Sequence, residues 1–155
     1  MIITKANKTD LSKILELQYL AYQSEAKLFN NQKIPPLVQT LKDIEEDYNR
    51  GIILKVLNED NIIIGSVRAY CDINNIIYIG KLMVHPDWQH QGIGTNLLLE
   101  VEKIYSNKIY ELFTSSKSEN NLRLYKNLGC KVFKEKSIND ELKFIYLRKI
   151  VSVLY

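Results

Sequence analysis

The sequence lacks several features that would place it in a specialised class of protein. It has only two cysteines, Cys71 and Cys130, which lie far apart and without the paired spacing of a zinc site. No apolar run approaches the ~20 residues of a membrane span. The polar N-terminus, with Lys5, Lys8 and Asp10, contains no signal-peptide core. These absences predict reduced, buried thiols, no bound metal, and a cytoplasmic protein with no membrane partner.

Long runs of basic residues are absent as well. The net charge of +3 arises from 21 basic and 18 acidic side chains spread along the chain, so composition suggests no nucleic acid partner. The chain is 46% hydrophobic and 25% charged, which is typical of a globular protein. No linker, repeat or low-complexity stretch divides it. We therefore expect residues 1–155 to form a single domain.

Hydrophobic periodicity predicts helices and strands in the first half of the chain. Turn residues at 58–61 and 72–75 separate three β-branched runs, which predicts an antiparallel meander. Pro35 and Pro36 open a helix that Gly51 ends. The predicted elements are a strand over residues 1–5, helices over 10–28 and 35–50, and strands over 52–57, 62–70 and 76–84.

The second half contains one predicted β-α-β unit. A helix from the glycine-bearing turn to about residue 106 precedes a strand over 109–114, so this strand should run parallel to residues 76–84. A helix over 121–128 ends at Gly129, and strands follow over 130–136 and 142–151. The order β-α-α-β-β-β-α-β-α-β-β predicts an α/β (α+β) fold with a mixed, mostly antiparallel sheet flanked by helices.

The most informative segment is VHPDWQHQGIGTNLLL, in which a strand ends, a turn with Gly92 and Gly94 follows, and a helix begins. Glycines allow the backbone to approach a ligand, and the unpaired N–H groups of a first helical turn suit an anion such as pyrophosphate. A Walker loop would need lysine directly after its second glycine, where this chain has Thr95, and a dinucleotide fingerprint would need glycine at Leu97. The segment therefore predicts a phosphate site of another kind.

Gln89, Gly92 and Gly94 match the pattern Q/R-x-x-G-x-G/A. This segment resembles the acetyl-CoA signature of the GNAT superfamily of N-acetyltransferases. The predicted order of elements is also that of the GNAT fold, so the resemblance covers nearly the whole chain. It implies acetyl-CoA as the cosubstrate.

A second segment, residues 118–129, resembles the family pattern S-x-x-N-x-x-x-L/Y-Y-x-x-L-G-F, in which an asparagine and a tyrosine reach the cofactor. Asn121 and Tyr125 occupy these two positions, four residues apart and on one helical face. The following residue, Cys130, stands where the family usually has phenylalanine or tyrosine, which affects packing and not chemistry.

The resemblance implies a cofactor site and one catalytic residue. Main-chain donors of the glycine turn would hold the pyrophosphate, and backbone N–H groups near a strand bulge at Met83 and Val84 would polarise the carbonyl. Tyr125, with a hydroxyl pKa of about 10, would protonate a leaving thiolate of about 8.5. The predicted site residues are Leu82, Met83, Val84, Gln89, His90, Gln91, Gly92, Ile93, Gly94, Thr95, Asn121 and Tyr125.

No general base is assigned. The strand over residues 76–84 carries no acid, and its inward candidates are Tyr78 and Lys81. His85 lies between Val84 and Pro86, which indicates a structural loop position. The resemblance implies that the first two helices and their loop form one wall of the acceptor site. The aromatic residues of these helices are expected mainly in the core, with contact to the substrate as the alternative; they are Tyr19, Tyr22, Phe29 and Tyr48.

These observations predict transfer of an acetyl group to a primary amine, on a small molecule or a peptide, by direct attack. A non-catalytic acyl-CoA-binding sensor is the alternative. Succinyl-CoA is a further donor that Arg68 or Lys81 would suit. An acidic bias around the second helix would favour a cationic amine unless it is a solvated helix face; its residues are Glu25, Asp43, Glu45, Glu46 and Asp47. Two copies could pair through an exposed edge of the last strand.

Overall fold

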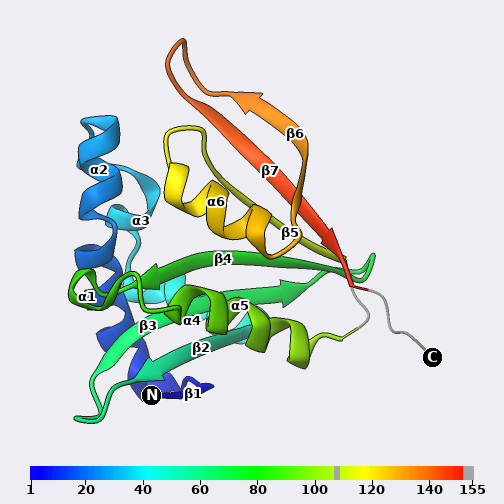
Figure 1. Cartoon of the computed structure of the whole chain (residues 1–155). Helices are drawn as coiled ribbons and strands as arrows, with labels where there is room; N and C mark the ends of the chain where they lie inside the picture. The colour runs from blue at the N-terminus through cyan, green and yellow to red at the C-terminus, as the bar shows by residue number, and fades with distance from the viewer. Residues whose placement is uncertain (107–108, 152–155) are drawn as a thin grey trace.

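A computed structural model describes residues 1–106 and 109–151 (Figure 1). The mixed α/β architecture predicted from the sequence is confirmed. In chain order the elements are β1 (Ile2–Lys5), η1 (Lys8–Asp10), α1 (Leu11–Ala21), α2 (Gln23–Phe29), α3 (Pro35–Val38), α4 (Leu41–Arg50), β2 (Ile52–Leu57), β3 (Ile63–Cys71), β4 (Ile76–Val84), η2 (Pro86–Trp88), α5 (Ile93–Ile104), β5 (Ile109–Ser115), α6 (Glu119–Asn127), β6 (Lys131–Ser137) and β7 (Lys143–Ile150).

The strands form a seven-stranded sheet in the order β1-β2-β3-β4-β5-β7-β6. All neighbouring pairs are antiparallel except β4 and β5, which run parallel as the β-α-β unit predicted. Two polar turns join the meander: the Asn58 side chain accepts hydrogen bonds from the N–H groups of Asp60 and Ile62, and Asp72 does the same for Asn74 and Ile76. These local bonds explain why the turns could be located from the sequence.

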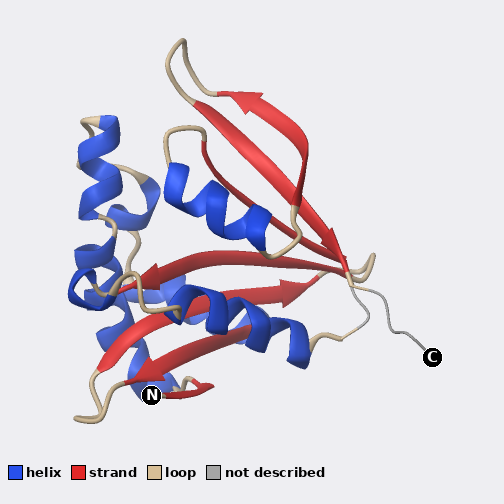
Figure 2. Cartoon of the chain, in the orientation of Figure 1, coloured by secondary structure: helices blue, strands red, loops and turns tan. Residues whose placement is uncertain are grey.

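Helices cover both faces of the β2-β3-β4 sheet (Figure 2). Ile53 packs with Leu11, Ile14 and Ile44 of α1 and α4, whereas its neighbour Leu54 belongs to the core that includes α5. Successive strand residues face opposite sides, so α1 and α4 lie on one face and α5 on the other. None of the helices in the described ranges is both long and apolar enough to span a membrane.

Each of the two long N-terminal helices predicted from the sequence is divided in the structure. The first breaks at Tyr22, which separates α1 from α2. The second breaks at Gln39, because Thr40 begins a new helix: its hydroxyl accepts from Asp43 N and the Asp43 carboxylate accepts from Thr40 N. This reciprocal capping box is a helix start that the apolar periodicity alone does not reveal.

Two expectations about the last strands and the cysteines are wrong. β7 lies between β5 and β6, so the exposed edge belongs to β6. The reason is burial: Ile145 and Leu147 of β7 alternate into the core, whereas every residue of β6 is exposed. Cys130 is buried, but Cys71 is exposed at the end of β3.

A substitution at Leu97 of α5 tests the assignment of the core between α5 and the sheet, because the Leu97 side chain is fully buried there. Leu97→Ala should lower the free energy of unfolding by about 2–5 kcal/mol, through lost burial and the cavity it leaves. Leu99→Ala, on the same helix with 38% of its surface exposed, is the matched control and should cost much less. Urea denaturation of the two variants measures this, and equal losses would contradict the assignment of the core.

Candidate active site

The candidate site lies where β4 and β5 separate. The two strands pair only over Ile76–Tyr78 and Ile109–Glu111 and then diverge (Figure 1). β4 also contains a bulge, since Ser66 pairs with Met83 but Arg68 pairs with Gly80, so β4 has one extra residue between these pairs. Lys81, inside the bulge, has a φ of 51°. The bulge was expected at Met83 and Val84, and it lies just before them.

The bulge leaves backbone donors facing the gap between the strands. His85 N donates to Ile64 O at 2.8 Å across the β3–β4 pair. Because backbone groups alternate in direction along a strand, the N–H of Val84 points away from β3, toward the β5 side. This donor can polarise a carbonyl placed in the gap, as the sequence resemblance implied.

The glycine turn, residues 89–95, leads directly into α5. Gly92 is the N-cap with a φ of 81°, a left-handed conformation that favours glycine, and no side chain caps the helix. The first N–H groups of α5 are therefore available to an anion, and the helix dipole adds a partial positive charge.

A cavity of about 890 Å³ opens at this turn, and we name it the turn cavity. All of the predicted site residues line it except Gln91 and Tyr125. Thr114 accepts a hydrogen bond from Asn121 at 3.4 Å, which directs Asn121 from α6 toward β5. The lining residues are Ala21, Tyr22, Ser24, Glu25, Leu28, Leu82, Met83, Val84, Trp88, Gln89, His90, Gly92, Ile93, Gly94, Thr95, Lys117, Ser118, Glu119, Asn120, Asn121 and Leu124.

Tyr125 does not line the turn cavity, but its hydroxyl interacts electrostatically with Glu25 and Tyr22, which do line it. Its side chain is 5% exposed, and burial raises the pKa of its hydroxyl, with a further rise from the negative charge of Glu25. Burial also raises the pKa of Tyr22, which the neighbouring Glu25 and Tyr125 raise further. Glu25 itself has a raised pKa because it is buried, although Lys81 partly offsets this.

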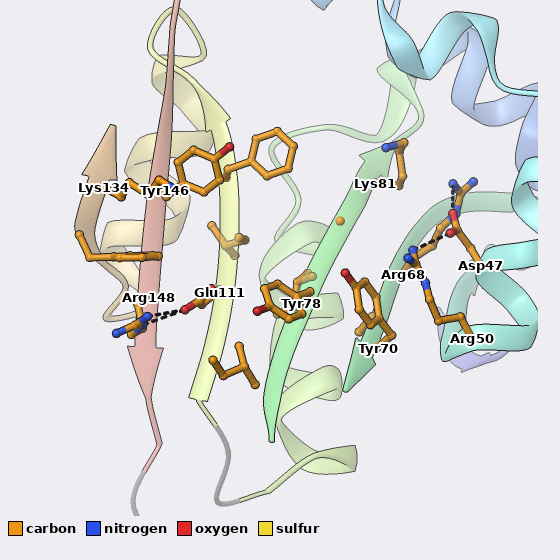
Figure 3. Close-up of a pocket in the computed structure, with 17 residues that line it drawn as sticks. Asp47, Arg50, Arg68, Tyr70, Tyr78, Lys81, Glu111, Lys134, Tyr146 and Arg148 are labelled. Atoms are coloured by element: carbon orange, nitrogen blue, oxygen red, sulfur yellow. Dashed lines mark hydrogen bonds and ion pairs between the residues drawn. The ribbon is translucent and has the colours of Figure 1, made fainter. Parts of the chain in front are cut away.

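A second cavity, of about 630 Å³, lies on the face of the sheet that α4 covers, and we name it the aromatic cavity (Figure 3). Its walls come from α4 and β3 on one side and from β5, β6 and β7 on the other. The lining residues are Asp47, Arg50, Arg68, Ala69, Tyr70, Ile76, Tyr78, Ile79, Gly80, Lys81, Glu111, Leu112, Phe113, Phe133, Lys134, Tyr146 and Arg148.

A buried polar network centred on Arg68 fixes one wall of the aromatic cavity. Its guanidinium donates to Gln18 of α1, to Gln39 and, at 3.1 Å, to the Asp47 carboxylate of α4. Gln18, which is fully buried, also donates to Pro36 O at 2.7 Å. Arg68 thus connects α1, α4 and the segment between α3 and α4 to β3. Burial lowers the pKa of Arg68, although Asp47 opposes this.

The linings of the two cavities are adjacent in sequence at the bulge, and we call this place the junction. Lys81 lines the aromatic cavity, and the next residue, Leu82, lines the turn cavity. Glu25 of the turn cavity and Asp47 of the aromatic cavity both act electrostatically on Lys81. Lys81 is therefore within electrostatic reach of an acidic residue from each cavity.

Sequence reasoning missed part of this site. Glu25 and Lys117 line the turn cavity, but neither lies in a motif position that marks it. Of the four helical aromatic residues, Tyr22 lines a cavity, while Tyr48 packs in the core and Tyr19 donates to Gln39 O. Only tertiary packing shows this difference.

His85 has a structural role, as its position suggested. Its Nδ1 atom accepts a hydrogen bond from Asp87 N at 3.1 Å, which caps η2. Of the acidic residues expected near the second helix, Asp43 caps α4, and Asp47 is paired with Arg50 and Arg68.

Comparison with known proteins agrees with this geometry. A sequence model of the acetyltransferase (GNAT) family matches residues 12–130, which include both motifs and the diverging strands. The chain belongs to this family. It is an acetyltransferase by that membership, and no curated protein sequence matches it significantly.

Solved structures share the fold of this acetyltransferase. The ribosomal-protein-S18-alanine N-acetyltransferase of Escherichia coli is 15% identical with a TM-score of 0.81, over 99% of this chain and 96% of that protein. A GNAT-family acetyltransferase of Staphylococcus aureus is 20% identical with a TM-score of 0.78, over 97% and 99%. The Salmonella typhimurium protein yncA, solved with its cofactor acetyl-CoA, is 16% identical with a TM-score of 0.75, over 100% and 96%.

Gly94 provides a direct test of the turn cavity. A Cβ atom there would meet Leu124 at 3.3 Å and Leu82 at 3.8 Å, so a large side chain must project into the cavity or displace α6. Gly94→Trp should abolish binding of coenzyme A, as measured by calorimetric titration, while circular dichroism shows a folded protein. Gly94→Ala, which adds only that Cβ, is the matched control and should retain binding. Unchanged affinity in the Trp variant would contradict the assignment.

Proposed function

We propose that this GNAT acetyltransferase transfers the acetyl group of acetyl-CoA to a primary amine by direct attack, with residues 1–155 acting as a single domain. The observation that carries the proposal is the junction at the bulge, beside the divergence of β4 and β5, where Lys81 lines one cavity and the next residue, Leu82, lines the other. Acetyl-CoA supplies an activated acetyl thioester in the turn cavity. The amine acceptor enters from the aromatic cavity. Neither step requires a covalent intermediate on the protein.

The turn cavity has the chemistry that coenzyme A requires. The uncapped N-terminus of α5 presents N–H groups to a pyrophosphate, and Lys117 lines the same cavity as a cation. The Val84 N–H faces the gap, where a pantetheine amide or thioester carbonyl could accept it. The yncA structure, which has the same fold, contains acetyl-CoA. These features support Leu82–Val84, the glycine turn and Asn121 as the residues that hold the cosubstrate.

Tyr125 is the proposed general acid. A tyrosine hydroxyl is protonated at neutral pH, so a proton is available for the departing thiolate, although burial raises the pKa of Tyr125 and so makes it a weaker acid. Tyr22 lies close enough to couple with Tyr125 electrostatically and lines the turn cavity itself. The structure therefore offers two hydroxyls, and they need separate variants.

Glu25 is the proposed general base, a role to which no residue could be assigned from the sequence. It lines the turn cavity, and it interacts electrostatically with Lys81 at the junction. Burial raises its pKa toward the range in which a carboxylate accepts a proton from an amine efficiently. A non-catalytic sensor would not need a base in this position, so Glu25 favours an enzyme over the sensor alternative.

Replacing Tyr125 separates catalysis from binding. Tyr125→Phe should lower kcat by about 100-fold or more while changing the affinity for acetyl-CoA by less than roughly threefold, because it removes only the hydroxyl group that donates the proton. Tyr22→Phe is the matched variant, and it should retain most of the activity. Thiol release and calorimetry measure the two quantities. A loss of kcat in Tyr22→Phe alone would transfer the role to Tyr22.

The role of Glu25 predicts a pH dependence. A base must be deprotonated, so the activity should fall as the pH drops through the raised pKa of Glu25. Glu25→Gln should lower kcat by about 100-fold or more and remove that acidic limb from the pH profile. Glu16→Gln, an exposed site on α1, is the control and should leave the profile unchanged. A wild-type profile in Glu25→Gln would exclude Glu25 as the base.

A further inference from the structure

The aromatic cavity has more positive than negative charge. Five cationic side chains and two anionic ones line it. Both anions are already paired: Asp47 lies 2.8 Å from Arg50 and 3.1 Å from Arg68, and Glu111 forms an ion pair with Arg148 (Figure 3). A cationic acceptor would meet repulsion here, whereas an acceptor with an anionic group would meet attraction.

Lys81 is the cation best placed to bind such a group. Within the described ranges it forms no ion pair shorter than 4.0 Å, although it is partly buried. Burial lowers its pKa, and so does the nearby Arg68. A desolvated cation without a close counter-charge is unfavourable, and an anionic ligand would supply that charge.

The position of Lys81 limits how far the anionic group can lie from the amine. Lys81 is in the bulge, and Leu82 beside it lines the turn cavity. The amine must reach the thioester at this same junction. Its anionic group must therefore be close to the amine in the molecule, and an α-amino acid fulfils this because both groups share one carbon atom.

The opposite wall of the cavity is aromatic and partly uncovered. Phe113 is 52% exposed, and its ring lies 5.3 Å from that of Tyr146. Phe133, 40% exposed, lies 6.5 Å from Tyr146. Exposed rings gathered in a cavity are typical of a surface that an apolar ligand group covers.

We propose that the acceptor is an α-amino acid with an apolar or aromatic side chain, whose carboxylate pairs with Lys81 and whose side chain lies against Phe113 and Tyr146. This inference rests on the proposed transferase function. The amine nitrogen bonds to the acetyl carbon, the carbon–sulfur bond breaks, one amine proton goes to a base, and the thiolate takes up a proton. The products are an N-acetyl amino acid and coenzyme A.

Three matched acceptors test this with the acetyl-CoA thiol-release assay: L-phenylalanine, L-phenylalaninamide and 2-phenylethylamine. The value of kcat/KM should be about 10- to 100-fold higher for phenylalanine than for the other two, because only phenylalanine can form the charged contact. Spermidine and kanamycin should be poor acceptors. Equal values across the three, or a preference for spermidine, would overturn the proposal.

Lys81→Met should remove the preference for phenylalanine over its amide. Methionine has the same unbranched stem as lysine, so the left-handed backbone of the bulge is not strained further. Lys136→Met, on the exposed strand β6 and outside the cavity lining, is the matched control and should keep the preference. An unchanged preference in Lys81→Met would overturn the role of Lys81. So would a loss of activity in Lys81→Met that appears only when succinyl-CoA replaces acetyl-CoA as the donor.

Binding separates this proposal from the transferase function. Calorimetric titration of the protein loaded with coenzyme A should show phenylalanine binding more tightly than its amide, and only while Lys81 is present. If such binding occurs without thiol release, the amino-acid site stands and the transferase function fails. If thiol release occurs without discrimination between acid and amide, the transferase function stands and the amino-acid site fails.

Discussion

The separation of β4 from β5 is the constraint on which the rest of the site depends. Parallel strands that stay paired satisfy each other's backbone groups and leave no room between them. Here the bulge in β4 changes the direction of the strand after three paired residues, so backbone donors face a gap instead of a neighbouring strand. The glycine turn and α5 follow directly from the diverging strand. One local irregularity therefore lies beside the proposed phosphate site, the proposed carbonyl site and the proposed acceptor entrance.

The gap stays open because other contacts hold its two sides apart. On one side, Arg68 connects β3 with α1, α4 and the segment between α3 and α4 through charged and amide groups. On the other, β7 pairs with β5 along its whole length, and the β6–β7 hairpin extends the sheet (Figure 1). Buried hydrogen bonds of this kind are costly to break, so they fix the geometry of the walls more strictly than apolar packing alone would.

Burial shifts the pKa values of several titratable groups near the junction. The pKa of Glu25 rises and that of Lys81 falls, while Tyr22 and Tyr125 are held protonated. Each shift arises mainly from desolvation, and the charges of neighbouring groups modify it. Groups from α1, α2, β4 and α6 are brought within electrostatic reach of one another. Such a concentration of perturbed groups beside a cavity is characteristic of a functional site.

The sequence by itself determined the elements, the meander, the β-α-β unit and the glycine turn, because these depend on periodicity and on turn residues whose effects are local. Tertiary structure alone decided the break of the first helix at Tyr22 and the interior place of β7. It also left Tyr125 buried outside the lining of the turn cavity, and it brought Glu25 and Lys81, from different elements, within electrostatic reach of each other. These features depend on long-range packing and on desolvation, which no pattern of neighbouring residues encodes. The positive charge of the aromatic cavity also depends on tertiary structure. From the sequence, Asp47 contributes to an acidic bias, but in the fold it is paired with Arg50 and Arg68.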